Sequence, residues 1–528
     1  MTLLLALILL PLLGAVALGL LRGSERVAKP VALAFSLAEF ALAAATWTAY
    51  DPGGPRLQLT SSLPWIPQFG ISLSFGVDGI ALIMIAVLAL LLPLVIGFGW
   101  RQQLPAGRSQ GGFLGLLLVQ QALTVAVFAA TDVFLFYVLF ELMLVPMYFL
   151  IGGYGGPRRQ YAAVKFFLFS FFGGLLMLAS AIGAYSYAAS ATGRGTFDWE
   201  QLRPVLAHAP THVQVWIFLG FFLAFAIKAP LVPFHTWLPD AAEQAPLGVA
   251  VIVVGVLDKV GTFGFLRYGL PLTPQAAHLL APLLLVLAVV GVLYGSLQAF
   301  GQQDLRRFVA FVSIAHFGFI ALGIFAFTEQ AEVGAVTYML NHSIATGLLI
   351  MVIGMVIARG GSSRIADYGG MARVTPLLAG ALLVAGLSTL SLPGTNSFVS
   401  EFLVLLGAFE TRPVFAVLAA VGMVLAAVYV LALYQRTMQG PLRGDALVGL
   451  TAGPGAAADP NAVSGGGTHR LRVGDLNTRE LAVLAPLIAL VLALGCYPKP
   501  VLDVVGPSAG ATMSEVGATG PATTQGGN

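Results

Sequence analysis

The sequence predicts an all-α polytopic membrane protein of about 14 transmembrane helices, and three observations support this fold class. Of the 528 residues, 58% are hydrophobic and 9% are charged, whereas soluble domains carry roughly 25% charged residues. The mean hydropathy is +0.90. Long apolar runs recur along the chain, and they lack the apolar–polar alternation and the ~10-residue length of barrel strands. This composition excludes a soluble enzyme, a disordered chain and a nucleic-acid-binding domain.

Fourteen apolar runs reach the roughly 20 residues that a helix needs to cross a ~30 Å hydrocarbon core. They lie near residues 2–21, 27–49, 76–99, 112–130, 132–151, 161–187, 213–238, 247–270, 277–300, 307–327, 330–358, 374–410, 413–434 and 480–505. The first three belong to an N-terminal unit, residues 1–111. The first run lacks the basic start of a signal peptide, so we expect it to remain as a helix.

The next ten spans predict an internal repeat, with helices 4–8 in residues 112–270 and helices 9–13 in residues 277–434. Polar residues recur at a nearly constant distance in these two segments. The matching positions are Glu141 and His316, Lys228 and Glu401, and Lys165 and His342, which lie 175, 173 and 177 residues apart. Because each repeat has an odd number of helices, the second copy must be inverted in the membrane.

Two of these spans are interrupted by proline. The seventh contains Pro230, Pro233 and Pro239, and the twelfth contains Pro393 followed by Gly394. Proline removes a backbone donor, and unwound backbone at membrane depth survives only where it lines a protein-enclosed polar cavity. Paired broken helices therefore indicate a transport site.

The C-terminal region combines one span with two segments of low complexity. Residues 438–478 are rich in Gly, Ala and Pro and are expected to form a flexible cytoplasmic linker. Residues 480–505 form the last predicted helix, and 506–528 are expected to be a flexible tail.

Basic residues predict the topology. Loops after odd-numbered spans hold 17 of the 26 Lys and Arg residues, the opposite loops hold six, and three lysines lie within spans. The positive-inside rule makes the side with 17 cytoplasmic. We therefore expect a multi-pass protein of the plasma membrane with both termini on the outer side.

Several ionisable residues fall within the predicted spans, where a charge costs at least ~2.5–3.5 kcal/mol. They are Glu141, Lys228, Lys259, His316, His342 and Glu401. A single Glu–Lys pair would be explained equally well as a structural bridge between helices. Six such groups spread over both halves favour proton transfer, because buried Lys–carboxylate pairs exchange protons when their separation changes and histidine titrates near neutral pH.

Three further residues are secondary candidates with open alternatives. Lys165 lies a few residues inside its span, where it either reaches the surface or lines a relay. His235 is equally consistent with local packing and with a role in the broken segment. Asp258 adjoins Lys259, but neighbours on a helix do not share a face, so it pairs with another helix or alters Lys259.

Other features predict no cofactor and no metal in this chain. The single cysteine, Cys496, excludes a disulfide scaffold and a thiolate-bound cluster. Neither a Gly-rich phosphate loop nor a cluster of metal ligands is present in the sequence. Asp78 and Asp132 lie near span ends, where we expect solvated anchors.

Several motifs resemble a known family. The stretches KAPLVPFHTWLPDAAEQAP, VLDKVGTFGFLRY, SIAHFGFIALGI, NHSIATGLL and SLPGTNSFVSEFLVL are similar to the antiporter-like subunits of respiratory complex I. The resemblance covers spans 3–13 and is strongest to the subunit M branch of bacterial NADH-quinone oxidoreductase, the counterpart of mitochondrial chain 4. It implies fourteen helices with inverted five-helix repeats.

The resemblance also implies roles for individual residues. Glu141 matches the glutamate that pairs with the broken-helix lysine, here Lys228. Lys259 matches the central lysine, and Glu401 matches the terminal group, which is usually lysine in the related subunits L and N. His316 and His342 match linking residues between the halves. Two departures, Ala242 in place of a common histidine and Asp258 beside the central lysine, leave the proton entry route open.

Together these features predict a proton-translocating membrane-arm subunit of a type I NADH:quinone oxidoreductase, driven by redox chemistry in other subunits. Its expected partners are neighbouring membrane-arm subunits, the lipid bilayer and protons, without nucleic acid. The alternatives are a subunit of a multi-subunit cation/proton antiporter, the membrane arm of a hydrogenase, and a structural subunit with vestigial charges.

Overall fold

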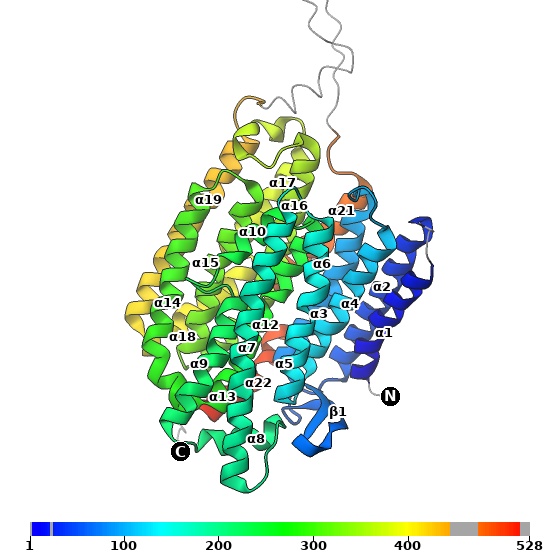
Figure 1. Cartoon of the computed structure of the whole chain (residues 1–528). Helices are drawn as coiled ribbons and strands as arrows, with labels where there is room; N and C mark the ends of the chain where they lie inside the picture. The colour runs from blue at the N-terminus through cyan, green and yellow to red at the C-terminus, as the bar shows by residue number, and fades with distance from the viewer. Residues whose placement is uncertain (1–2, 22–24, 444–473, 518–528) are drawn as a thin grey trace, which may run out of the picture.

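The computed structural model describes residues 3–21, 25–443 and 474–517, and nearly all of them belong to one bundle of helices (Figure 1). The helices of the first half are α1 (Leu3–Leu20), α2 (Glu25–Ala49), α3 (Gly79–Phe98), α4 (Gln110–Ala129), α5 (Val133–Leu142), α6 (Leu144–Tyr154), α7 (Arg159–Thr192), α8 (Trp199–Ala207), α9 (Thr211–Lys228) and α10 (Trp237–Gln244). Over all the described residues, thirteen helical stretches are long and apolar enough to cross a membrane.

The helices of the second half follow without a long connection. They are α11 (Leu247–Ile252), the π-helical turn η3 (Val253–Leu257), α12 (Lys259–Gly264), the π-helical turn η4 (Phe265–Gly269), α13 (Leu270–Leu272), α14 (Pro274–Gly301), α15 (Leu305–Phe325), α16 (Glu329–Gly360), α17 (Pro376–Thr389), α18 (Asn396–Thr411), α19 (Pro413–Met438), α21 (Thr478–Cys496) and α22 (Lys499–Val516). The predicted twelfth span is divided between α17 and α18, so the total of fourteen spans stays a prediction.

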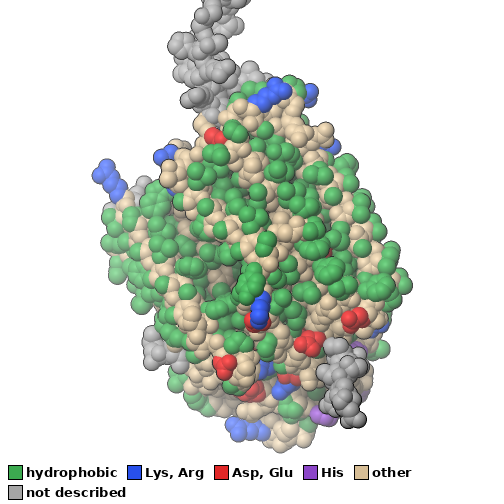
Figure 2. Space-filling model, turned by 180° about the vertical axis from the view of Figure 1, so that it is seen from behind, with side chains coloured by type: hydrophobic (Ala, Val, Ile, Leu, Met, Phe, Trp, Pro, Cys, Tyr) green, Lys and Arg blue, Asp and Glu red, His purple; other side chains and the backbone are tan. Residues whose placement is uncertain are grey.

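Burial separates the central helices from the outer ones. The most apolar stretches of 247–272 and α15 are 100% buried, whereas that of α21 is 28% buried. Apolar side chains cover the middle of the outer surface, and few charged groups interrupt them (Figure 2). Lipid supplies no hydrogen bonds, so backbone groups must be paired within helices and polar side chains must turn inward. Lys259, His316 and His342 lie on the central segments 247–272, α15 and α16.

Both broken helices are present. The seventh predicted span ends its first half at Lys228, and α10 starts at Trp237 after an unwound segment. The indole Nε1 of Trp237 donates to the carbonyl of Ile227 at 2.7 Å and replaces a lost backbone donor. In the twelfth span, residues 390–395 separate α17 from α18, and Ser391 has φ of 59°.

The C-terminal region differs from the sequence prediction. The predicted helix 480–505 is two helices, because α21 ends at Cys496 and Pro498 precedes a new helix, α22, that continues to Val516. Residues 506–516 are thus helical and not part of a flexible tail. Their buried positions recur at helical spacing and pack on α3 and α16. The predicted linker 438–478 and the rest of the tail lie mainly outside the described residues.

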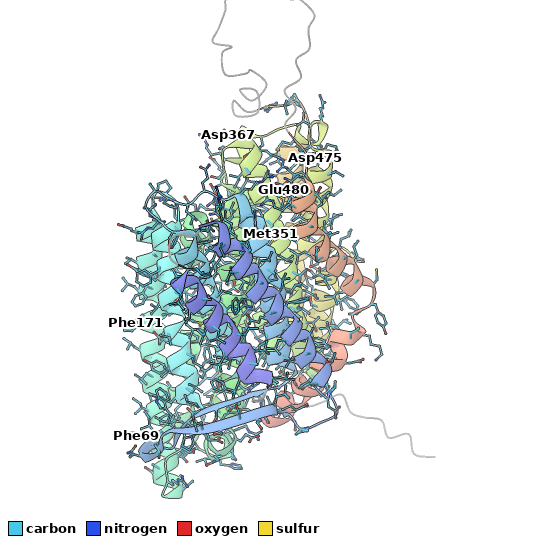
Figure 3. All side chains as sticks on the ribbon, turned by 90° about the vertical axis from the view of Figure 1, so that its right-hand side faces the viewer. Phe69, Phe171, Met351, Asp367, Asp475 and Glu480 are labelled. Carbon is cyan, nitrogen blue, oxygen red and sulfur yellow. The ribbon has the colours of Figure 1, made fainter. Side chains whose placement is uncertain are left out.

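A β-hairpin and a short helix were not predicted. Strands β1 (Gln58–Ile66) and β2 (Ile71–Val77) pair antiparallel, and Gly70 makes the turn with φ of 65°. The predicted span 76–99 therefore begins within β2. The hairpin and α8 lie at the end of the bundle that we call the lower end (Figures 1 and 3). Chain residues 443 and 474 mark the opposite, upper end.

The chain begins and ends on the same side of the bundle. α1 starts and α22 ends at the lower end, as Figure 1 shows. This arrangement agrees with the predicted placement of both termini on one side. The direction of the bundle relative to the two membrane faces stays a prediction.

Candidate functional site

Lys259 is the centre of a buried polar cluster. Its ammonium Nζ donates to the carbonyl of Val254 and to Nδ1 of His342, each at 2.6 Å, and lies 3.0 Å from Oδ1 of Asp258. The ammonium therefore makes two hydrogen bonds and one ion pair. The side chains of Lys259, Asp258 and His342 are all 0% exposed. A proton on Lys259 is in direct contact with groups from two helical segments.

Two π-helical turns shape the backbone on either side of Lys259. In η3, the amide of Asp258 donates to the carbonyl of Val253, five residues earlier. Such turns widen a helix and leave carbonyls available to side chains. The carbonyl of Val254 accepts from Lys259, which lies five residues later. The Asp258 carboxylate forms an ion pair with Lys259, although adjacent residues of a regular helix do not share a face.

The polar cluster continues from Lys259 across the second half of the chain. The ring centroids of His342 and His316 lie 5.2 Å apart, and those of His316 and Tyr338 lie 5.6 Å apart. The Tyr338 hydroxyl donates to Oε2 of Glu401 at 3.2 Å. Nδ1 of His316 and Nε2 of His342 have no hydrogen-bond partner among the described residues. We call Asp258, Lys259, His342, His316, Tyr338 and Glu401 the buried path.

Two members of this region were missed in the sequence. Tyr338 joins His316 to Glu401, and the Ser391 hydroxyl donates to the same Glu401 oxygen as Tyr338. Tyr338 precedes His342 by four residues, a spacing that places both on one face of α16. Ser391 lies two residues before Pro393, within the break. Both signals were present, but a tyrosine and a serine in an apolar run carry no charge that would single them out.

The charged residues of the first half are arranged differently. Glu141 and Lys228 form no ion pair within 4.0 Å, so the direct pairing implied by the resemblance is not observed. Lys228 Nζ has no hydrogen-bond partner in the described part of the chain and lies 5.1 Å and 5.3 Å from the ring centroids of Phe140 and Phe166. The ammonium is held between two aromatic faces and not by a carboxylate.

Gly174 makes room for Glu141. A Cβ atom at position 174 would overlap Oε1 of Glu141, and one at Gly173 would lie 3.0 Å from Cα of Ala224 on α9. The glycine pair thus allows α7 to approach both α9 and the glutamate. The role of these two glycines was not predicted from the sequence.

Lys165 belongs to an ion-pair network at the upper end. Its Nζ lies 2.6 Å from Asp240, and Arg307 joins Asp240 to Glu243 with two 2.9 Å contacts. Arg158 completes the network at 2.8 Å from Glu243. Burial raises the pKa of both carboxyls, but the hydrogen bonds from Lys165, Arg307 and Arg158 outweigh it and hold the pKa values of Asp240 and Glu243 below their usual range.

The remaining candidates lie away from the buried path. His235 is 5% exposed and packs edge-on against Tyr294, with ring centroids 5.1 Å apart. Ala242 lines a small pocket beside Arg306. His235 therefore lies in an aromatic environment, and Ala242 lines the same small pocket as Arg306.

Asp78 and Asp132 are buried, contrary to the expectation of solvated anchors. They are 0% and 1% exposed. Each caps a helix, since Asp78 accepts from the amide of Ala81 and Asp132 from that of Leu135, both at 2.9 Å. The amide of Ser72 in β2 donates to Asp132, and Asp78 pairs with Arg267, so both carboxylates are held by protein contacts.

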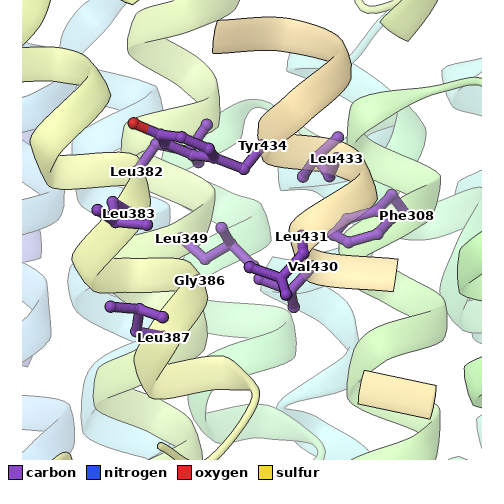
Figure 4. Close-up of a pocket in the computed structure, with 10 residues that line it drawn as sticks. All are labelled: Phe308, Leu349, Leu382, Leu383, Gly386, Leu387, Val430, Leu431, Leu433 and Tyr434. Carbon is purple, nitrogen blue, oxygen red and sulfur yellow. The ribbon is translucent and has the colours of Figure 1, made fainter. Parts of the chain in front are cut away.

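A pocket between α15, α16, α17 and α19 is lined almost wholly by apolar side chains (Figure 4). Only Tyr434 brings a polar group to it. In residues 3–21, 25–443 and 474–517, no group of three or more His, Cys, Asp or Glu is arranged to hold a metal ion. The buried path is therefore the candidate functional site.

Comparison with known proteins gives the same result as the motifs. The family described as NADH:quinone oxidoreductase/Mrp antiporter, transmembrane, matches residues 130–426. NADH-quinone oxidoreductase subunit M of Mycobacterium tuberculosis is 43% identical, with 97% of this chain and 94% of that protein covered. The Rhodobacter capsulatus subunit M is 36% identical, with 94% of each covered.

Solved structures share the fold. A chain of Thermus thermophilus respiratory complex I with bound NADH has a TM-score of 0.83 at 29% identity, covering 97% of this chain and 99% of that one. A chain of the Mrp complex from a Dietzia species has a TM-score of 0.82 at 23% identity, covering 98% and 100%; at that identity it shows the fold alone. With the match to the family profile and the identity over nearly its whole length, this multi-pass membrane chain belongs to the NADH-quinone oxidoreductase subunit M family.

Proposed function

We propose that this chain is a proton-translocating membrane-arm subunit of a type I NADH:quinone oxidoreductase. The observation that carries the proposal is the buried path, in which six polar side chains run from Asp258 to Glu401 through the interior of an apolar bundle. Buried ionisable groups are costly, and a connected set of them across a membrane protein is typical of proton relays.

Lys259 acts as the central proton carrier. Its ammonium gives a proton to His342 Nδ1 along an existing 2.6 Å hydrogen bond. The Asp258 carboxylate, 3.0 Å away, holds the proton on Lys259 until another positive group compensates the negative charge of the carboxylate. At ~5 Å and an effective dielectric constant near 20, one charge pair is worth about 3 kcal/mol, or roughly two decades in proton affinity. A small movement is thus sufficient to release the proton.

From His342 the proton passes through His316 and Tyr338 to Glu401. The free nitrogens of the two rings each accept or donate in turn. The Tyr338 hydroxyl already donates to Glu401, so it transfers one proton forward as it receives another. Ser391, in the break of the second broken helix, stabilises the Glu401 carboxylate by a further hydrogen bond.

Lys228 and Glu141 act on this path by their charge. Lys228 lies close enough to feel the charges of both Glu141 and Asp258, and it has no hydrogen-bond partner to neutralise it among the described residues. A change in the Glu141–Lys228 separation therefore changes the field at Asp258. In this way the first half drives the second without exchanging a proton with it.

The environment of the path follows from the sequence and the family. We infer that the upper end faces the cytoplasm of a plasma membrane and that both termini lie outside. The reason is that most basic residues lie in the loops at the end away from the termini. Neighbouring membrane-arm subunits are the inferred partners. Redox chemistry and any cofactor belong to other subunits, whose energy reaches this chain as charge shifts.

A cation/proton antiporter subunit is the second candidate, favoured by the Mrp-like fold at a TM-score of 0.82. The identity of 43% to a subunit M over nearly the whole chain supports the first candidate more strongly. Identification of the co-purifying subunits separates the two: quinone-reductase subunits are expected, and antiporter subunits alone would favour the second.

The translocation itself is tested with Lys228→Ala in the assembled complex. We expect normal assembly, because this ammonium has no partner to leave unpaired in the described structure, and loss of NADH-driven proton pumping in membrane vesicles. Parental pumping in an assembled Lys228→Ala complex would contradict the proposal and favour a structural subunit with vestigial charges.

A further inference from the structure

A second cluster of buried charges lies at the lower end, apart from the buried path. Asp78 Oδ2 is 2.7 Å from Nη2 of Arg267 and 3.9 Å from Nε of Arg56. Glu515 of α22 pairs with both Arg56 and Arg203. We call these five residues, together with Glu332 of α16, the arginine cluster. They come from six different segments that the fold brings together under the hairpin.

The three arginines surround one indole ring. The guanidinium carbons of Arg56, Arg203 and Arg267 lie 4.9, 5.1 and 5.5 Å from the ring centroid of Trp199 on α8. Cations at such distances are attracted by the face of an aromatic ring. The three guanidinium groups therefore lie close together around Trp199 at the lower end.

Glu332 is the unexplained member of the cluster. Its side chain is 0% exposed, and neither carboxyl oxygen has a hydrogen-bond partner among the described residues. It lies on α16, which packs against α22, the helix that carries Glu515 of the cluster. A carboxyl group without partners at such depth has no structural task that an apolar residue would not perform better.

The charges of the arginine cluster are matched only in one protonation state of Glu332. Three arginines face Asp78, Glu515 and Glu332, so the cluster is neutral when all three acids are ionised. A proton on Glu332 leaves one positive charge in excess. Burial favours the protonated carboxyl, whereas the arginines favour its release. Glu332 is thus a group on which a proton arrives and from which it is expelled.

Exposure increases through the cluster toward the surface. The side chains of Asp78 and Arg267 are 0% and 1% exposed. Those of Arg56 and Glu515 are 15% exposed, and that of Arg203 is 31% exposed. Several buried polar atoms of this region, such as both carboxyl oxygens of Glu332 and Nε of Arg203, have no hydrogen-bond partner in the described chain, as expected where water enters. The cluster therefore connects the interior with the lower surface.

Two segments lead from the buried path to the cluster. Glu332 precedes His342 on α16 by ten residues, or about 15 Å. Arg267 follows Lys259 by eight residues, or about 12 Å, on the neighbouring segment. Tyr338, whose hydroxyl donates to Glu401, lies six residues after Glu332 on the same helix, or about 9 Å.

We propose that Glu332 is the proton-release group of this subunit and that the arginine cluster is its outlet. This inference rests on the proposed translocation. In the release step the O–H bond of the Glu332 carboxyl breaks, and the proton passes to a water molecule near Arg56. The arginines keep their protons and stabilise the carboxylate that remains.

The experiment uses the complete complex in sealed membrane vesicles, with Glu332→Gln, Lys259→Ala and Glu329→Gln. Glu329→Gln is the matched control, because it removes the same group one turn earlier on α16, at a partly exposed position. We expect Glu332→Gln to assemble and to lower proton translocation by at least about tenfold, as Lys259→Ala does, with Glu332→Asp restoring part of it. Glu329→Gln is expected to leave pumping at the parental level.

The outcomes separate the two proposals. Loss of pumping in Lys259→Ala with parental pumping in Glu332→Gln would overturn the outlet alone. Parental pumping in Lys259→Ala would overturn the proposed function itself. A measurement on the parental complex covers the case in which Glu332→Gln does not assemble. A hydrophobic carbodiimide, which reacts with protonated carboxyls, is expected to label Glu332 in the mapped peptide, and an unlabelled Glu332 would contradict its role.

Discussion

The two halves of the molecule hold buried charges in opposite ways. In the first half, Lys228 and Glu141 have no ion pair between them, and the Lys228 ammonium has no hydrogen-bond partner among the described residues. From α11 onward, Lys259 makes two hydrogen bonds and an ion pair with Asp258, and the polar contacts continue to Glu401. A buried charge without a hydrogen-bond partner responds to changes in the local electric field, whereas a charged group that is hydrogen-bonded to another ionisable group transfers a proton to it. In the proposed function, Lys228 and Glu141 therefore act by their charge, and the residues from Lys259 to Glu401 carry the proton.

The largest expected effect compares the two lysines by stability. Lys259→Met leaves the Asp258 carboxylate buried without its partner, so we expect a loss of about 3–5 kcal/mol. Lys228→Met removes a charge that has no partner to lose in the described structure, so we expect a neutral change or a gain of about 1–4 kcal/mol. Thermal unfolding of the complex in lipid nanodiscs measures both. Equal destabilisation by the two variants would break the contrast.

Gly174→Ala tests how closely the first half is fitted around Glu141. The added methyl group meets Oε1 of Glu141, so we expect a destabilisation of about 1–3 kcal/mol and weaker pumping as the glutamate is displaced. Gly380→Ala on α17 is the control, because a Cβ atom there meets nothing within 4 Å. A Gly174→Ala complex as stable and active as Gly380→Ala would show that the position of Glu141 is not critical.

Tyr338→Phe tests the connection in the second half. Loss of the hydroxyl removes the contact to Glu401, and we expect pumping to fall by about tenfold with assembly unchanged. Tyr434→Phe, at the apolar pocket of Figure 4, is the matched control with no such contact. Rates of pH change in vesicles measure both. An equal response of the two tyrosine variants would remove Tyr338 from the path.

The smallest effect concerns the ion-pair network around Asp240 and Glu243. Because their pKa values are lowered in the folded protein, the network contributes stability above the unfolded pKa values near 4, and this is lost as the pH falls through the lower folded values. Asp240→Asn should therefore cost about 0.5–1 kcal/mol at pH 7, less at high salt, and nothing at very low pH. A difference that grows on acidification would contradict this sign.

Much of the fold was predictable because lipid imposes simple rules. Apolar runs and two proline-interrupted spans gave the helices and both breaks, since backbone in lipid must be helical. The hairpin β1–β2 and α22 were missed, because neither spans the membrane and the small residues of α22 read as a flexible tail. The buried Asp78 was missed because its burial depends on tertiary contacts such as the ion pair with Arg267, which local sequence patterns do not reveal.

The site was predicted as a set of charges but not as a geometry. Glu141, Lys228, Lys259, His316, His342 and Glu401 were named from their depth in apolar runs and from the family resemblance. The contact between Asp258 and Lys259 depends on a π-helical turn, which no periodicity of the sequence reveals. The inverted repeat stays a prediction. The two residues that the repeat would match lie at different places relative to the breaks. Lys228 is the last residue of α9, before the first break, whereas Glu401 lies within α18, after the second break.

The central claim is that protons cross this subunit through Lys259, and the number of protons translocated per NADH oxidised by Lys259→Ala tests it most directly. The measurement uses the purified complex in proteoliposomes, with Lys499→Ala, a lysine 64% exposed in α22, as the control. The account predicts a lower ratio for Lys259→Ala and the parental ratio for Lys499→Ala. A parental ratio in an assembled Lys259→Ala complex would contradict it.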